Sequence, residues 1–176
     1  MKIIFLDIDG VLYQGSFSDR EHQNRMSNQE IPLIKELPKI ANKLSSTQLT
    51  KLCNYDLSAM LGFDESAVQL LIRLCEETGA KIVLTTSWRV GRDLTYMQNL
   101  FSFWDFASYI IDLTPRLFTG RKSEIDAWLQ QQTQEISSFV VLDDDKFPGF
   151  TDYGEKFIYC RELFCQRLYE QSHKLL

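Results

Sequence analysis

The sequence predicts an α/β fold in which a parallel sheet carries helices on both faces. Short apolar runs of strand length alternate with amphipathic helical patterns along most of the chain. The three most apolar of these runs each end in polar residues that are able to do chemistry. The length of 176 residues, with 44% hydrophobic and 24% charged residues, is that of one ordinary globular domain.

The first strand is predicted at residues 3–6, a continuous apolar run that leads into Asp7, Asp9 and Gly10. Because side chains alternate along an extended chain, Asp7 and Asp9 point to the same side. Two carboxylates this close repel each other, and a bound divalent cation is the usual remedy. The alternative is a hairpin, since Asp-Gly between apolar residues is a strong short hairpin signal. A hairpin would leave Asp7 without a role.

Residues 14–62 are predicted to form a small cap insertion, mostly loop and helix, in a core made of residues 1–13 and 63–176. The stretch 13–29 has neither a strand period nor a helix period, and the following segment is only weakly amphipathic. The insertion contains four spaced lysines, Lys35, Lys39, Lys43 and Lys51. Such a run is more typical of a solvated helix face than of a phosphate-binding groove.

The second part of the chain alternates between helix and strand. A helix is predicted between Asp64, a good N-cap, and Gly79, a helix-ending residue. The elements predicted after it are a strand at 81–84, a helix at 92–100, a strand at 109–111, a helix that follows Arg121 and Lys122, strands at 139–142 and 157–159, and a helix at 162–176. This is a Rossmann-like order, in which ligands bind at the carboxyl ends of the strands.

Polar residues at those strand ends suggest phosphoryl transfer. They are Asp7 and Asp9, Thr85 and Thr86, and Asp143 and Asp144, with Arg121 and Lys122 at a nearby helix start. Together they supply a carboxylate nucleophile, an acid/base carboxylate, donors for phosphoryl oxygens, a cation, and acids for a metal. Each signal alone is more typical of a turn or a solvated surface. Their shared position after strands favours a common site.

These residues resemble the haloacid dehalogenase (HAD) superfamily of aspartate-nucleophile phosphotransferases. Residues 7–12 resemble its first motif, Thr85 its second, Arg121 or Lys122 its third, and Asp143 with Asp144 its fourth. More narrowly, the chain resembles the HAD phosphatase-type domain of bacterial RNA repair proteins and its stand-alone relatives. The segments that carry this resemblance are 63–68, 79–84, Thr86-Ser87-Trp88-Arg89, 113–117, Arg121 with Glu124-Ile125 and Trp128-Leu129, and 142–144.

The resemblance implies a Mg²⁺-dependent phosphatase that works through an aspartyl-phosphate intermediate. Asp7 would attack phosphorus, while Asp9 would protonate the leaving oxygen and then activate water. Mg²⁺ would be held by Asp7, the backbone carbonyl of Asp9 and Asp144, with Asp143 nearby, an oxygen-only set that suits this ion. Thr85 would bind the phosphoryl oxygens.

Three residue assignments stay open in the sequence. Thr86 could take the place of Thr85. The spacing to the following glutamate favours Arg121 over the lysine that is more typical of the superfamily at that position, with Lys122 as the other candidate. Arg89 is a candidate substrate-binding residue, and an equally good interpretation is a guanidinium that staples its own loop.

Other functions also fit parts of the pattern. A non-catalytic or effector-type binding module could use the same fold, and a nucleic-acid 3′-phosphatase follows from the family analogy alone. Phosphotransfer or phosphomutase chemistry would use the same Asp7. A receiver domain fits poorly, because its phosphoacceptor belongs on the third strand, where Asp112 has no paired acid. The expected partner is therefore a phosphorylated substrate, either a small molecule or an RNA or DNA end.

Composition restricts the setting. A net charge of −5 and a pI near 5.1 argue against a broad basic surface for duplex nucleic acid. The four cysteines show no C-x-x-C spacing, so reduced structural thiols are expected rather than a zinc site. The first strand begins too early for a secretory signal, and no apolar run approaches a membrane span. A cytoplasmic location is expected, with export by a route without a cleaved signal left open. The sequence does not specify an oligomeric state.

Overall fold

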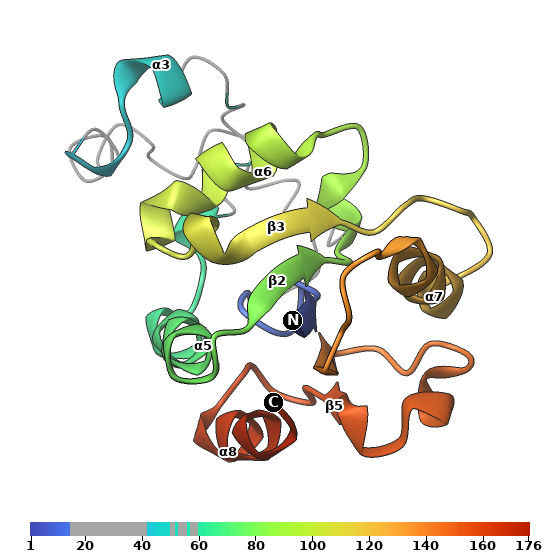
Figure 1. The fold of residues 1–176 in the computed structure, drawn as a ribbon. Helices are drawn as coiled ribbons and strands as arrows, with labels where there is room; N and C mark the ends of the chain where they lie inside the picture. Colours follow the sequence, from blue (N-terminus) through green and yellow to red (C-terminus); the bar gives the residue numbers. More distant parts are fainter. Residues whose placement is uncertain (15–41, 50–51, 53–55, 57–59) are drawn as a thin grey trace.

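The computed structural model describes residues 1–14, 42–49, 52, 56 and 60–176 (Figure 1). Five parallel strands form one sheet in the order β3-β2-β1-β4-β5. They are β1 Lys2–Leu6, β2 Lys81–Leu84, β3 Ile110–Leu113, β4 Ser138–Asp143 and β5 Phe157–Tyr159. The predicted α/β fold is confirmed. The hairpin alternative is wrong, because β1 lies in the centre of the sheet with parallel neighbours on both sides.

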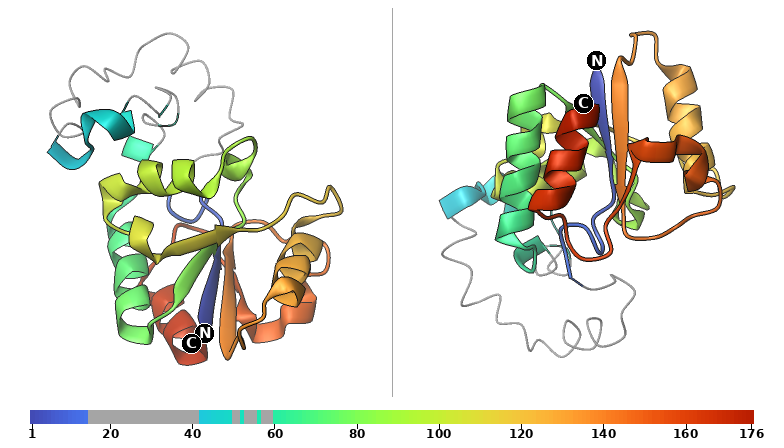
Figure 2. Two further views of the ribbon diagram at one scale, coloured as in Figure 1. Left: turned by 45° about the horizontal axis from the view of Figure 1, so that its top comes forward. Right: turned by 90° about the horizontal axis from the view of Figure 1, so that it is seen from below.

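Helices cover both faces of the sheet. The helices of the described residues are α3 Ser46–Leu49, which lies apart from the sheet, α5 Glu65–Thr78, α6 Leu94–Phe101, α7 Arg121–Gln131 and α8 Gln166–Leu175, with 3₁₀ turns η1 Ser87–Arg89, η2 Ser102–Trp104, η3 Ala107–Tyr109 and η4 Phe150–Lys156. Helices α5 and α8 lie on one side and α7 on the other (Figure 2). Among the described residues, none of the helices combines the length and apolar character needed to span a membrane.

Alternation along the central strand supplies both layers of the core. Ile4 and Leu6 of β1 belong to the larger cluster, which contains the buried residues of α5, α6 and α8. Ile3 and Phe5 belong to the second cluster, in which the ring of Phe5 meets Trp128 of α7 edge-on with centroids 5.4 Å apart. All four β1 side chains are fully buried. The continuous apolar run is therefore explained by a strand covered on both faces.

Helix boundaries follow the capping residues. The side chain of Asp64 accepts a hydrogen bond from the backbone N–H of Ala67 at 2.8 Å, and Gly79 ends α5 in a left-handed conformation with φ 71°. Helix α8 begins at residue 166, later than the predicted 162. The reason is that the preceding segment is tied to the loop after β1, where the N–H of Phe164 donates to the carbonyl of Val11 at 2.8 Å.

Most of the predicted cap, including Lys35, Lys39 and Lys51, lies outside the described residues. The described part of 42–60 packs against α6 and η2. Asp56, which is buried, accepts two hydrogen bonds from Arg92 at 2.9 and 2.6 Å and another from the hydroxyl of Tyr96. Lys43 pairs with Asp105 at 3.1 Å. The buried hydrophobic residues of this part join the larger core cluster; they are Leu44, Leu52 and Met60.

The cysteines that the structure describes are free thiols. Cys75 and Cys160 are buried and Cys165 is exposed, while Cys53 lies outside the described residues. Burial raises the pKa of the Cys75 thiol to about 12, so this side chain acts as a small apolar group of the core.

Candidate active site

Three neighbouring strands bring the predicted site residues to one edge of the sheet. The backbone ladder continues past the strand ends, since the N–H of Asp7 donates to the carbonyl of Leu142 and the N–H of Thr85 donates to the carbonyl of Leu6, both at 2.9 Å. These bonds continue the register of the sheet to the residues that follow β1, β2 and β4. The strand order reverses between β1 and β4, which is the point where ligands bind in sheets of this kind.

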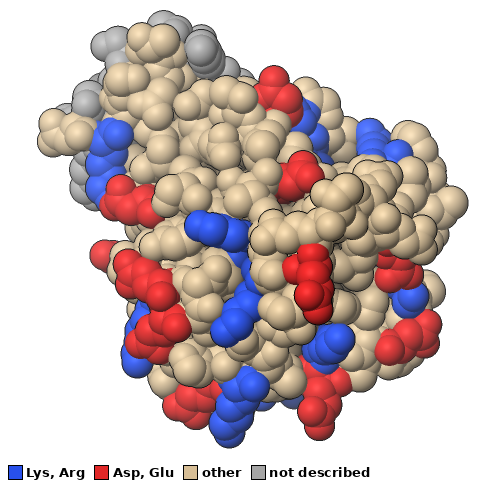
Figure 3. All heavy atoms as spheres, in the orientation of Figure 1, with Lys and Arg blue, Asp and Glu red and all other residues tan. Residues whose placement is uncertain are grey.

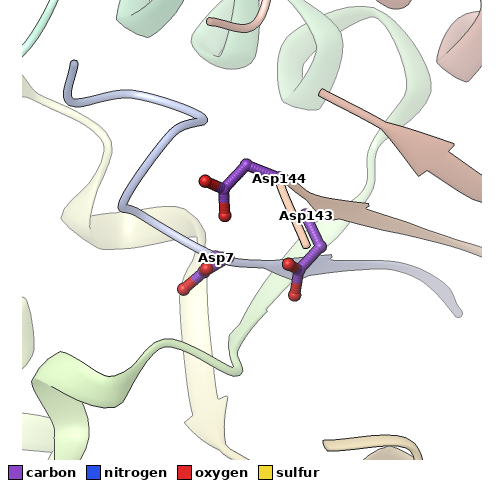
Figure 4. A group of neighbouring side chains, drawn as sticks. All are labelled: Asp7, Asp143 and Asp144. Atoms are coloured by element: carbon purple, nitrogen blue, oxygen red, sulfur yellow. The ribbon is translucent and has the colours of Figure 1, made fainter. Parts of the chain in front are cut away.

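Three carboxylates form a compact group at this point. One oxygen each from Asp7, Asp143 and Asp144 lies within 4.8 Å of the others, and all three side chains turn toward a shared space (Figure 4). Asp7 and Asp143 are buried, whereas Asp144 is exposed. A shell of carboxylate oxygens with one open side suits Mg²⁺, which keeps waters and binds substrate oxygens.

Two buried polar atoms of this edge have no hydrogen-bond partner within the described part of the chain. They are Oδ1 of Asp7 and Oγ1 of Thr85. A buried polar atom without a partner is destabilising by about 1–3 kcal/mol, so such atoms are usually satisfied by a ligand or an ion. A cation would satisfy the carboxylate oxygen, and a phosphoryl oxygen would accept from the hydroxyl. The residues at the site therefore fit a metal and a phosphoryl group.

Arg121 and Lys122 point in different directions, although they are adjacent. The Nη1 of Arg121 lies 2.9 Å from Oδ2 of Asp7 and 2.8 Å from Oδ2 of Asp143. Lys122 instead pairs with Asp126 at 2.6 Å on the next turn of α7. Consecutive helix positions are turned by about 100° around the axis, so only one of the two can face the sheet edge. The structure brings Arg121 to the carboxylates and takes Lys122 away from them.

The charges of this group are strongly coupled. Burial opposes the charge of Arg121, but the carboxylates of Asp7 and Asp143 outweigh it and raise the pKa of its guanidinium. Burial, followed by the charge of Asp7, raises the pKa of Asp143 to about 7, against the pull of Arg121. The same two causes raise the pKa of Asp144. Without a cation, Asp143 therefore keeps a proton to a higher pH than an exposed aspartate does.

Gly10 is required by both its conformation and its surroundings. Its φ is 67°, in the left-handed region that disfavours side chains. A Cβ on this residue would lie 2.1–2.3 Å from the side-chain atoms of Asp144. The lack of a side chain at Gly10 therefore leaves room for the carboxylate of Asp144, which lies close to the backbone at this point.

The two threonines after β2 have separate tasks. Oγ1 of Thr86 accepts the backbone N–H of Trp88 at 3.3 Å and so caps the turn η1. The hydroxyl of Thr85 makes no such bond within the described residues. Of the two residues that the sequence left open for phosphoryl binding, Thr85 is the one whose hydroxyl lacks a partner among the described residues. Asp9, the predicted acid/base, accepts a hydrogen bond at Oδ1 from the indole Nε1 of Trp88 at 3.1 Å.

The guanidinium of Arg89 is held by backbone carbonyls and by one carboxylate of the protein. It donates to the carbonyls of Thr85, Thr86 (2.6 Å) and Thr114 (3.1 Å), and it pairs with the carboxylate of Glu124. The other oxygen of Glu124 accepts the N–H of residue 117 at 3.0 Å. This geometry matches the loop-stapling alternative for Arg89 and does not bring it to the carboxylate group. Sequence reasoning gave Glu124 no role.

The acid on β3 has a structural environment. Asp112 accepts the indole N–H of Trp128 at 2.7 Å and the N–H of Leu113 at 2.8 Å. It lies on the edge strand, which β2 separates from β1. A receiver-type phosphoacceptor at this position has no support in the structure.

A comparison with protein families identifies the chain's family. A family model described as the HAD domain in Swiss Army Knife RNA repair proteins matches residues 3–163, which include every predicted site residue and all strand residues except Lys2. No curated protein and no solved structure matches the chain.

Proposed function

The chain belongs to the family of HAD domains in Swiss Army Knife RNA repair proteins, and from this membership and the site geometry we propose that it is a Mg²⁺-dependent phosphatase with Asp7 as nucleophile. One observation carries the proposal. Oδ1 of Asp7 and Oγ1 of Thr85, which directly follow the adjacent strands β1 and β2, are buried without a partner among the described residues. Asp7 is itself one of the three carboxylates that suit a cation.

The proposed reaction has two chemical steps. In the first, a carboxylate oxygen of Asp7 attacks phosphorus, the bond to the leaving oxygen breaks, and Asp9 gives that oxygen its proton. In the second, Asp9 takes a proton from water as the water attacks the aspartyl-phosphate. Inorganic phosphate leaves, and Asp7 is regenerated as a carboxylate.

Side chains around Asp7 have supporting roles in this proposal. Arg121, which lies within 3 Å of Asp7 and Asp143, keeps a positive charge where phosphoryl oxygens would arrive. Thr85 donates its hydroxyl to one of these oxygens. Mg²⁺ would be held by Asp7, Asp143, Asp144 and the backbone carbonyl of Asp9; when bound, it neutralises charge on the phosphoryl group.

Hydrolysis of p-nitrophenyl phosphate tests the proposal. We expect turnover that requires Mg²⁺, stops with chelator, and is lost in Asp7→Asn and Asp9→Asn. Asp112→Asn is the matched control, because this carboxylate lies on the edge strand and accepts hydrogen bonds from the indole of Trp128 and the N–H of Leu113. Hydrolysis that survives Asp7→Asn would refute the aspartyl-phosphate mechanism.

A non-catalytic binding module would be stabilised by Mg²⁺ without hydrolysing phosphoesters. A complete metal site is stabilised by its ion through mass action, so Mg²⁺ should raise the melting temperature of the wild type and not that of Asp144→Asn. If no turnover accompanies this stabilisation with any phosphoester, the binding module becomes the better interpretation.

A nucleic-acid 3′-phosphatase is the second candidate, and one surface feature favours it. In the loop between β3 and α7, at the carboxyl edge of the sheet, Phe118 is 83% exposed and the guanidinium of Arg116 lies 4.5 Å from the centroid of its ring. An exposed aromatic ring beside an arginine suits stacking on a base. On the face seen in Figure 3, basic and acidic side chains are interspersed, so any contact of this face with nucleic acid would be local.

Substrate preference separates the two candidates. A 3′-phosphatase should turn over a 3′-phosphorylated oligonucleotide with higher kcat/KM than p-nitrophenyl phosphate. Phe118→Ser should lower kcat/KM for the oligonucleotide and leave that for p-nitrophenyl phosphate unchanged. Equal effects of Phe118→Ser on both substrates would count against base stacking at this loop.

A further inference from the structure

The hydrogen bond between Trp88 and Asp9 joins residues that are 79 positions apart. Trp88 is in η1, two residues after Thr86, and it is 1% exposed. Its indole Nε1 lies 3.1 Å from Oδ1 of Asp9. An indole N–H only donates, so this contact fixes which oxygen of Asp9 is the acceptor.

Packing holds the indole ring in place. The ring of Trp88 lies with its centroid 5.6 Å from Phe63, 6.2 Å from Tyr13 and 6.4 Å from Phe101. Its backbone is held as well, because Oγ1 of Thr86 accepts its N–H. A buried aromatic side chain with neighbours on several sides has one rotamer. The indole N–H is therefore a fixed donor to which Asp9 must adjust.

The fixed donor determines where a proton on Asp9 can sit. Oδ1 accepts from the indole, so a protonated Asp9 carries its proton on Oδ2. In the proposed reaction, Asp9 first gives a proton to the leaving oxygen and then takes one from water. In both transfers the same oxygen of Asp9 must point toward the reacting oxygen, first that of the leaving group and then that of water. A carboxylate that could rotate about its Cα–Cβ and Cβ–Cγ bonds would have this orientation only part of the time.

We propose that Trp88 is a positioning residue that orients the carboxylate of Asp9 and assigns the transferred proton to Oδ2. This inference rests on the proposed function, because it concerns the acid/base residue of that reaction. In the proposed reaction, Trp88 touches neither the metal-binding carboxylates nor the phosphoryl group. It acts through Asp9.

The leaving group provides the decisive readout. A p-nitrophenolate leaves with little need for a proton, whereas an alkoxide from an alkyl phosphate requires one. Since kcat/KM reports the steps up to formation of the aspartyl-phosphate, Trp88→Phe should lower kcat/KM for an alkyl phosphate about tenfold more than for p-nitrophenyl phosphate. A general loosening of the fold would lower kcat/KM for both substrates equally. That result would overturn the proposal.

Trp104 offers a matched control. Its indole packs in the same aromatic group, stacked on Phe63 with centroids 6.3 Å apart, but it donates to the backbone carbonyl of Met60 at 2.9 Å. Trp104→Phe removes the same N–H and the same ring area without touching Asp9. We expect it to leave the ratio of alkyl to aryl kcat/KM unchanged.

A double-mutant cycle tests whether Trp88 acts through Asp9. In Asp9→Asn, the acid is already lost, so adding Trp88→Phe should change kcat/KM for the alkyl phosphate by less than about twofold. An additional tenfold loss in the double variant would mean that Trp88 contributes by another route, and the proposal would be wrong.

A spectroscopic measurement separates this proposal from the proposed function. The ¹H–¹⁵N spectrum has three tryptophan indole signals, from Trp88, Trp104 and Trp128. Asp9→Ala should move the Trp88 signal and leave the other two in place, whether or not the protein hydrolyses phosphate. An unmoved Trp88 signal overturns the proposal alone. A moved signal without any phosphatase activity in the wild type locates the failure in the proposed function, and the positioning role falls with it.

Discussion

Arg89 and Glu124 form an ion pair in which both side chains are buried, with exposed fractions of 7% and 10%. Through the other hydrogen bonds of these two residues, the pair joins the loops after β2 and β3 to the first turn of α7. The helix that carries Arg121 is thereby connected to the strand end that carries Thr85.

Loss of this pair should destabilise the protein. Glu124→Gln leaves the charge of Arg89 buried and unpaired, which we expect to lower the free energy of unfolding by about 3 kcal/mol. Urea denaturation measures the change. The control is Asp105→Asn, another change of charge alone, in a pair with Lys43 whose side chains are 74% and 44% exposed; it should change stability by less than about 1 kcal/mol. Equal changes would contradict the prediction.

The adjacent cations of α7 should differ in their effect on catalysis. Arg121→Ala removes the charge next to Asp7, and kcat should fall by about 10²–10³. Lys122→Ala removes a charge that is paired with Asp126 instead, so kcat should stay within about threefold of the wild type. Steady-state hydrolysis of p-nitrophenyl phosphate measures both. A larger loss in Lys122→Ala than in Arg121→Ala would reverse the assignment made from the geometry.

Two glycines with similar backbone angles should respond differently to alanine. Gly10 has φ 67° and Gly79 has φ 71°, so either substitution carries backbone strain of about 1–2 kcal/mol. Only at Gly10 would the new methyl group overlap Asp144. Gly10→Ala should therefore abolish Mg²⁺-dependent hydrolysis, while Gly79→Ala should lower the melting temperature and keep activity. Activity that persists in Gly10→Ala would show that Asp144 can move without loss of function.

The pKa of Asp143 predicts how the metal-free protein responds to pH. Its folded-state pKa, raised to about 7 by burial and by the charge of Asp7, lies above the unfolded value near about 4. Between these values the folded state holds a proton that the unfolded chain has released, and this contribution to stability is lost as the pH rises through about 7.

Unfolding in chelator at a series of pH values tests this expectation. The wild type should lose stability relative to Asp143→Asn between about pH 4 and pH 7, since the variant has no proton to release at this position. Parallel stability curves for the two proteins would mean that Asp143 is ionised throughout this range.

The apolar runs and capping residues made much of the fold predictable. The strands at 81–84 and 157–159 occur as predicted, β1 differs by one residue at one end, and β4 differs by one residue at each end. Asp64 and Gly79 bound α5 as their side-chain and backbone chemistry requires. Such features depend on neighbours in the sequence, which is why they can be inferred from it.

The details of the site depend on geometry that a sequence does not contain. Arg121 and Lys122 are both cations at a helix start, and the rotation of α7 decides which one reaches Asp7. The contact between Trp88 and Asp9 spans two loops brought together only by the sheet. The one sequence signal for it was a large aromatic residue two positions after the strand-end threonines.

The position of β1 also affects the order in which the protein can form during translation. This strand is synthesised before both of its partners, and its pairing with β4 waits until residues 138–142 have left the ribosome. Until then one edge of an apolar strand stays open, and open edges of this kind invite association with other chains. Asp143 and Asp144 follow directly on β4. The pairing that covers the second edge of β1 therefore also brings the last carboxylates of the candidate site into place, before β5 adds to β4.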